Sequence, residues 1–303
     1  MKLADKTSLG WRLVCMRSRH SLSAWVSFSL LTLGASVLSA AEPVVHKDLF
    51  YTAEKEKLQS LDVYAPAEGK NHPVVIWIHG GGWKKGDKAG MQKKPQAFVD
   101  KGYVLVSLNY RFLPEVTLKD MMEDLAKGIG WVHEHAAEYG GNPDSLVVMG
   151  HSAGAHLAAL ICTDDRYLKA AGVSFTSLKG CVPLDVSAYD VPKRMKDGGS
   201  EGITKNFIAI FGAEEASQRE FSPVYHIAKD KHIPAFLILH VASRDDTKAQ
   251  AHWLEGKLKE AGISAQVHAA EGKTHGTIST DLGGETDVPT QVLWKFLSEV
   301  VGS

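Results

Sequence analysis

The sequence contains few cysteines, and their spacing excludes two classes of protein. Only Cys15, Cys162 and Cys181 occur among 303 residues. This number is too small for the disulfide framework of a short secreted scaffold, and the spacing does not match a zinc site. Cys162 and Cys181 each lie in an apolar segment. We therefore expect two buried thiols, with a disulfide between them as the alternative.

The sequence also lacks the charge and motif patterns of nucleic-acid, nucleotide and metal binding. Residues 41–303 carry 29 Lys and Arg against 34 Asp and Glu, and no basic run stands out, so we expect no nucleic-acid partner. The glycine-rich runs match neither G-x-G-x-x-G nor G-K-[ST], which excludes the usual phosphate-binding loops. The segment His133-Glu134-His135 lacks the H-E-x-x-H spacing of a zinc site. We predict no metal and no other cofactor.

One apolar stretch near the N-terminus is marginal in length for a membrane span. Residues 22–38 are apolar but include serine and glycine, whereas a spanning helix needs about 20 predominantly apolar residues. A basic segment precedes this stretch and small residues follow it at 39–41, an order typical of a secretory signal peptide. We predict a signal over residues 1–41 and a periplasmic or secreted mature protein without stable membrane association. A retained membrane anchor is the alternative.

The rest of the chain, residues 42–303, has the length and pattern of one α/β domain. Segments 44–51 and 58–64 alternate like the strands of a hairpin. Six later apolar segments are typical of strands covered on both faces, at 74–78, 103–109, 145–149, 180–184, 235–240 and 264–269. Helices are expected at 118–138, 153–163, 247–261 and 288–301. We predict a mostly parallel eight-stranded sheet with an N-terminal antiparallel hairpin and helices on both faces.

Residues 186–224 interrupt this alternation of strands and helices. The segment contains Gly198-Gly199, many charges and few apolar clusters. We expect either a small lid insertion over a site or a surface loop with a short helix.

The motif Gly150-His151-Ser152-Ala153-Gly154 follows the apolar segment 145–149 directly. A strand, a serine between small residues and a following helix are the parts of a nucleophile elbow. Gly150 and Gly154 leave room for a sharp turn that lifts the Ser152 hydroxyl clear of the sheet. The pattern predicts that Ser152 is a catalytic nucleophile.

A second glycine-rich motif, His79-Gly80-Gly81-Gly82-Trp83, follows the apolar segment 74–78. Its backbone N–H groups are suited to face an oxyanion, and glycine is needed there because a side chain would crowd the acyl carbonyl. We predict an oxyanion hole formed by the N–H groups of Gly81, Gly82 and Ala153. An ordinary turn is the alternative, but a turn does not need three glycines.

A serine nucleophile needs a histidine base. Among fourteen histidines, His275 lies in a loop after the last predicted strand, at the edge where an α/β sheet places its ligand groups. We predict His275 as the base. His151 and His156 flank Ser152 but are expected to point elsewhere.

The base in turn needs a carboxylate to orient it. We expect this acid in the loop after strand 235–240. Asp245 and Asp246 both lie there, and adjacent residues point in different directions. We predict Asp246 as the acid, and Asp245 remains the alternative.

On these residues the chain resembles the α/β-hydrolase superfamily, in its HGGG/GxSAG esterase–lipase branch. His79–Trp83 resembles the oxyanion motif, Asn109-Tyr110-Arg111-Phe112 a Tyr-Arg segment of the branch, and residues 141–156 the elbow with its approach. The match runs from about residue 44 to the C-terminus. It departs at His240-Val241, where His-Gly is usual, and this departure bears on which residue is the acid.

The resemblance implies an α/β-hydrolase fold and a serine hydrolase that cleaves carboxylic esters of small or aromatic groups. The feruloyl and acetylxylan esterases and the related arylformamidases are the similar groups. The implied partner is a small-molecule ester. An arylformamidase-like amidase and a non-catalytic binding protein on the same fold are the alternatives. The sequence does not predict an oligomeric state.

Overall fold

The computed structural model describes residues 41–198 and 201–302. Residues 1–40 of the predicted signal segment lie outside this part of the chain. In the described part, no helix combines the length and the apolar character needed to cross a membrane.

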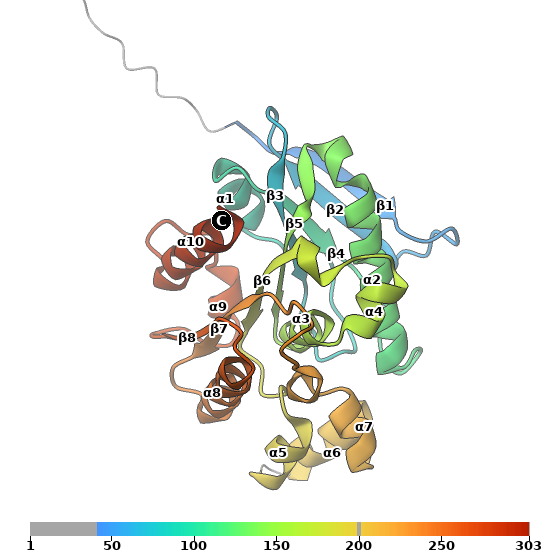
Figure 1. Cartoon of the computed structure of the whole chain (residues 1–303), viewed down its shortest axis with the longest axis vertical. Helices are drawn as coiled ribbons and strands as arrows, with labels where there is room; N and C mark the ends of the chain where they lie inside the picture. Colours follow the sequence, from blue (N-terminus) through green and yellow to red (C-terminus); the bar gives the residue numbers. More distant parts are fainter. Residues whose placement is uncertain (1–40, 199–200, 303) are drawn as a thin grey trace, which may run out of the picture. The chain divides into compact units, whose positions relative to one another are not determined.

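Eight strands form one sheet in the described residues, in the order β1-β2-β4-β3-β5-β6-β7-β8 (Figure 1). Their bounds are β1 Val44–Phe50, β2 Ser60–Ala65, β3 His72–Ile78, β4 Val104–Leu108, β5 Gly141–His151, β6 Leu178–Leu184, β7 Ala235–Val241 and β8 Ala265–Ala270. β1 pairs antiparallel with β2, and β2 with β4, whereas all later pairs are parallel. The predicted sheet with its N-terminal hairpin and the α/β-hydrolase fold are confirmed.

Helices cover both faces of this sheet. The α-helices are α1 Lys94–Asp100, α2 Leu118–His135, α3 Ala153–Thr163, α4 Asp165–Ala170, α5 Val191–Lys196, α6 Glu201–Phe211, α7 Glu215–Glu220, α8 Asp245–Glu260, α9 Thr277–Thr280 and α10 Val288–Val301. Short 3₁₀ turns occur at η1 Ala136–Tyr139, η2 Phe175–Ser177 and η3 Pro223–His226.

Successive side chains of the central strands belong alternately to the apolar cores on the two faces of the sheet. In β3, Ile76 and Ile78 belong to the apolar core under α2, α3 and α8, whereas Val75 and Trp77 belong to the core under α1 and α10. Successive side chains of a strand point to opposite faces, so an all-apolar strand requires a cover on each side. The continuous apolar runs of the sequence therefore reflect a central sheet with two cores.

The helix before the serine strand has clear start and stop signals. Thr117 caps α2 by accepting a hydrogen bond from the Asp120 N–H, and the Asp120 side chain accepts one from the Thr117 N–H. The 3₁₀ turn η1 follows α2 and ends at Gly140, whose φ of 75° is a left-handed conformation that favours glycine. The chain then enters β5, whose carboxyl end carries Ser152.

The segment 186–224 is a helical insertion that contains α5, α6 and α7 (Figure 1), and η3 begins at its end. Phe211 of α6 packs edge-on against Trp83, with ring centroids 5.3 Å apart. The Lys84 ammonium donates a hydrogen bond to Asn206 at 3.3 Å. The insertion thus contacts the loop after β3 and contains helices as well as loops. That it acts as a lid over the site stays a prediction.

Candidate active site

Ser152 stands in the sharp turn between β5 and α3, with φ 56° and ψ −123°. A side chain at Gly150 would place its Cβ 2.3 Å from the Gly154 carbonyl oxygen, and one at Gly154 would place it 2.2 Å from the Ile78 carbonyl oxygen. Both distances are too short for any Cβ, so only glycine permits this turn. The strained serine backbone is held by close packing on both sides.

His275 brings its ring to this serine from the loop between β8 and α9. Its Nε2 lies 2.9 Å from Ser152 Oγ, and nearly half of its side chain is exposed. The geometry matches the predicted nucleophile–base pair. The sequence thus predicted the contact between Ser152 and His275, which lie 123 positions apart in the chain.

His151 fixes the histidine loop, contrary to the expectation that it points elsewhere. Its Nε2–H donates to the His275 carbonyl at 2.6 Å, and the two rings lie 4.6 Å apart between centroids. Burial, followed by the neighbouring His275, lowers the pKa of His151 to about 4. His151 is therefore neutral at physiological pH and adds a hydrogen bond to the site without adding a charge.

The carboxylate behind His275 belongs to Asp185. Its Oδ2 accepts a hydrogen bond from His275 Nδ1 at 2.6 Å, and its Oδ1 accepts one from the Val241 N–H at 3.0 Å. Burial alone would raise the pKa of Asp185. Hydrogen bonds from His275, the Val241 N–H and Thr247 outweigh burial, and the charge of Arg244 adds to them. The pKa of Asp185 therefore lies well below its usual range, and the carboxylate is ionised at physiological pH.

The prediction of Asp246 as this acid is wrong. Asp246 lies at the start of α8, where its Oδ2 is 3.3 Å from Arg244 Nη2 and 3.8 Å from Arg194 Nη2. Asp245, the alternative, begins the same helix. The sheet order explains the difference. β6 lies directly beside β5, so the residue after β6 meets the histidine, whereas the chain after β7 turns into α8.

One sequence signal pointed to Asp185. It follows the apolar run 180–184 directly, at the same sheet edge that was used to choose His275. The order serine, acid, histidine also holds for Ser152, Asp185 and His275. What the sequence could not supply was the neighbour relation of the strands.

A cleft of about 630 Å³ contains Ser152 and His275 together with the glycine-rich loop. Gly81 and Gly82 line it with φ 129° and 63°, both in the region that favours glycine. In the described residues their backbone N–H groups donate no hydrogen bond to the protein. Ala153 follows the serine as the first residue of α3. The three predicted oxyanion residues thus lie at or beside the nucleophile, and the two glycine N–H groups are available to a bound group.

Trp83 is a packing residue that ties the glycine-rich loop to α3 and the insertion. Its Nε1–H donates to His156 Nδ1 at 3.2 Å, and the His156 Nε2–H donates to the Phe221 carbonyl at 2.7 Å. Burial lowers the pKa of His156 to about 4. A neutral imidazole can accept at one nitrogen and donate at the other, and both contacts here require that form.

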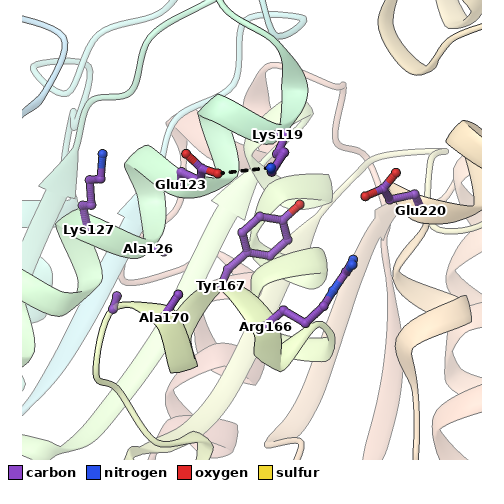
Figure 2. A pocket seen from close by; sticks show the side chains of 9 residues that line it. Lys119, Glu123, Ala126, Lys127, Arg166, Tyr167, Ala170 and Glu220 are labelled. Atoms are coloured by element: carbon purple, nitrogen blue, oxygen red, sulfur yellow. Dashed lines mark ion pairs between the residues drawn. The ribbon is translucent and has the colours of Figure 1, made fainter.

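The described residues contain no group of three or more side chains suited to hold a metal ion. Cys162 and Cys181 are free and buried, as expected, and burial raises the pKa of Cys181. A further cavity, of about 360 Å³, lies beside α2 and α4, with the Tyr167 ring and alanines between charged side chains (Figure 2). No serine, cysteine or histidine lines it, so it does not repeat the serine–histidine pair of the first cleft.

The model of the BD-FAE family matches residues 61–258. The chain belongs to the BD-FAE family. It is 33% identical to a probable isoprenylcysteine alpha-carbonyl methylesterase of Arabidopsis thaliana, over 77% of this chain and 51% of that protein. It is 41% identical to the esterase LipQ of Mycobacterium tuberculosis, over 78% and 57%. The chain thus spans about half the length of these curated relatives.

Solved esterase structures share the fold of this BD-FAE member. A truncated carbohydrate esterase from gut microbiota superposes with a TM-score of 0.74 at 18% identity, over 87% of this chain and 98% of that one. A thermophilic esterase from Thermogutta terrifontis, solved with propionate bound, gives 0.64 at 23% identity, over 86% and 94%. At these identities the likeness establishes the fold alone.

Proposed function

We propose that this BD-FAE family member is a serine hydrolase that cleaves carboxylic esters through an acyl-enzyme on Ser152. The observation that carries the proposal is one continuous line of hydrogen bonds. It runs from Ser152 Oγ to His275 Nε2 at 2.9 Å and from His275 Nδ1 to Asp185 Oδ2 at 2.6 Å. At one end of this line stands the buried Asp185 carboxylate. At the other end Ser152 lies in the cleft, beside two glycines whose N–H groups donate no hydrogen bond to the described part of the protein.

In the proposed reaction His275 removes the hydroxyl proton of Ser152 while the oxygen attacks the ester carbonyl. Asp185 holds the ring with Nε2 facing the serine and stabilises the imidazolium that forms. The N–H groups of Gly81, Gly82 and Ala153 receive the negative charge of the tetrahedral intermediate. His275 then gives its proton to the departing alcohol, and water repeats the sequence to release the acid.

We propose small esters as the substrates of this cleft. Glycines 80–82, 86 and 90 form much of its wall, and Lys85, Gln92, Ser279 and Thr280 supply polar atoms. The relatives named above are esterases, and the acyl and alcohol groups are proposals for this chain.

A substrate panel tests the proposal. Short p-nitrophenyl esters, a feruloyl ester, an acetylated sugar and an N-formyl aniline are compared with wild-type protein and with Ser152→Ala. We expect ester turnover in the wild type and its loss in the variant, with an unchanged melting temperature. Turnover of the formamide alone would assign an amidase, and tight binding without turnover of any compound would assign a binding protein.

We also infer that the mature protein acts outside the cytoplasm, after removal of residues 1–41. The basic, apolar and small-residue order of the N-terminal segment supports this proposal. An acidic mature domain with no predicted nucleic-acid partner agrees with a role on esters from the surroundings.

A further inference from the structure

The Arg244 guanidinium contacts both Asp185 and His275, and the reaction described above gives it no role. Arg244 follows β7 directly before α8 and reaches back to the carboxyl end of β6. Its Nη1 is 2.5 Å from Asp185 Oδ2 and 2.8 Å from His275 Nδ1. Its side chain is 33% exposed, whereas that of Asp185 is fully buried.

His275 Nδ1 therefore has two close neighbours but can make only one strong hydrogen bond to them. If Nδ1 carries a hydrogen, it donates to Asp185 and leaves Nε2 free to accept the Ser152 proton. If Nδ1 is bare, it accepts from Arg244, Nε2 carries the hydrogen, and the serine has no base. The second form also places a bare nitrogen 2.6 Å from a carboxylate oxygen, which is repulsive.

In the productive tautomer Nδ1 donates to Asp185, and the two donors Nδ1 and Arg244 Nη1 are held 2.8 Å apart by the carboxylate that both of them bind. Asp185 is ionised and accepts from both His275 Nδ1 and Arg244 Nη1. In this form Arg244 aligns the carboxylate. The same cation opposes the positive charge that His275 acquires when it takes a proton, because like charges at this distance disfavour the charged form.

The other charged and titratable groups around the ring do not replace this effect. His151, at the end of β5, contacts the ring in a tilted arrangement and is neutral. Behind Arg244, Asp246 accepts from Nη2 at 3.3 Å and also faces Arg194 of α5 at 3.8 Å. Buried Lys94 donates to the Ser279 carbonyl at 2.7 Å and acts on His151 by its charge.

We propose that Arg244 is a positioning residue that aligns Asp185 and, by its charge beside His275, keeps the imidazole unprotonated to lower pH than the Asp185–His275 pair alone would. The hydrolase would then retain activity in mildly acidic surroundings. This inference rests on the proposed function, because it assigns Arg244 to the same acid–base pair.

The test compares Arg244→Gln, Arg244→Met and Arg244→Lys with the wild type. Glutamine keeps an N–H donor for Asp185 and removes the charge, methionine removes both, and lysine keeps the charge. The matched control is Arg166→Gln. Arg166 also binds a fully buried carboxylate, Asp164, at 2.7 Å, but far from the cleft. The rate on a short p-nitrophenyl ester is followed across pH at a wavelength where nitrophenol and nitrophenolate absorb equally.

We expect the acid limb of kcat/KM to move up by about one pH unit in Arg244→Gln and Arg244→Met. This is the low end of the range for a nearby charge, because Arg244 is partly exposed. The plateau should change by less than about tenfold in Arg244→Gln, and the acid limb should stay in place in Arg244→Lys and Arg166→Gln. A purely structural role would lower the plateau and leave the limb where it is, and this result would overturn the inference.

A second measurement does not depend on turnover. Histidine is labelled with ¹³C at Cε1, the His275 signal is assigned by its loss in His275→Gln, and its pH midpoint is compared between wild type and Arg244→Gln. An upward shift without any hydrolysis would overturn the proposed function but uphold the charge effect. Hydrolysis with an unshifted midpoint would overturn the inference alone.

Discussion

Replacing Asp185 by asparagine should stop catalysis by changing the tautomer of His275. The Val241 N–H holds Oδ1 of residue 185 at 3.0 Å, so the asparagine oxygen takes that place and its NH₂ group faces the ring. A donor would then lie about where Oδ2 now stands, 2.6 Å from Nδ1. Nδ1 must accept, and Nε2 must carry the hydrogen toward Ser152. The base is lost although the side chain is nearly the same shape.

The expected magnitude follows from this tautomer argument. The same exchange costs about 10⁴ in kcat in a well-studied serine protease, which corresponds to about 5.5 kcal/mol in the barrier. The asparagine can escape by flipping its amide, but the NH₂ group would then face the Val241 N–H. Burying two opposed donors costs about 1–3 kcal/mol. The unflipped form also opposes two donors, because its NH₂ group faces Arg244 Nη1. The two forms therefore compete, and about 10⁴ is the upper limit of the expected loss in kcat.

Steady-state kinetics on a short p-nitrophenyl ester measures the loss, and Asp246→Asn is the matched control. Asp246 is 31% exposed and pairs with Arg244 and Arg194, so its exchange should change kcat by less than about tenfold. Melting temperatures check that both variants fold. If Asp246→Asn lost activity and Asp185→Asn kept it, the assignment of the acid from this structure would be refuted.

Three further predictions concern the oxyanion loop, acid stability and export. Gly81→Ala should reduce kcat by at least about 10²-fold, because its Cβ would lie 1.7 Å from a carbonyl oxygen of the loop. Gly82→Ala should reduce kcat less, because no atom lies near the position of its Cβ. Equal kcat values for the two variants would refute this ranking. Buried His156 has a pKa of about 4, below the unfolded value of about 6.5, so it should lower the stability by about 3 kcal/mol as the pH drops from about 6.5 to 4. His151 has a similar pKa and adds to the fall, so His156→Gln should lessen the fall in melting temperature over this window without abolishing it; a flat wild-type curve would contradict the assignment. Secreted material should begin near Ala41 or Glu42 by N-terminal sequencing, whereas an intact N-terminus in the membrane fraction would indicate an anchor.

The sequence by itself determined the parts of the protein that depend on neighbours along the chain. Continuous apolar runs predicted the strands, because a strand between two helical layers buries both faces. Ser152 and its flanking glycines were readable because the sharp turn permits no side chain at Gly150 or Gly154. His275 was chosen from its loop after the last strand, and the structure places its ring at the serine.

Only the tertiary structure decided which carboxylate stands behind His275. Asp185 and Asp246 both follow apolar strands, and nothing local separates them. Their roles depend on the strand order, which puts β6 beside the serine strand and sends the chain after β7 into a helix. The hydrogen bond between Asp185 and His275 joins residues 90 positions apart, and Arg244 joins the same carboxylate across 59. Such contacts follow from packing of the whole sheet, which sets the direction of each loop side chain, and no short stretch of sequence contains that information.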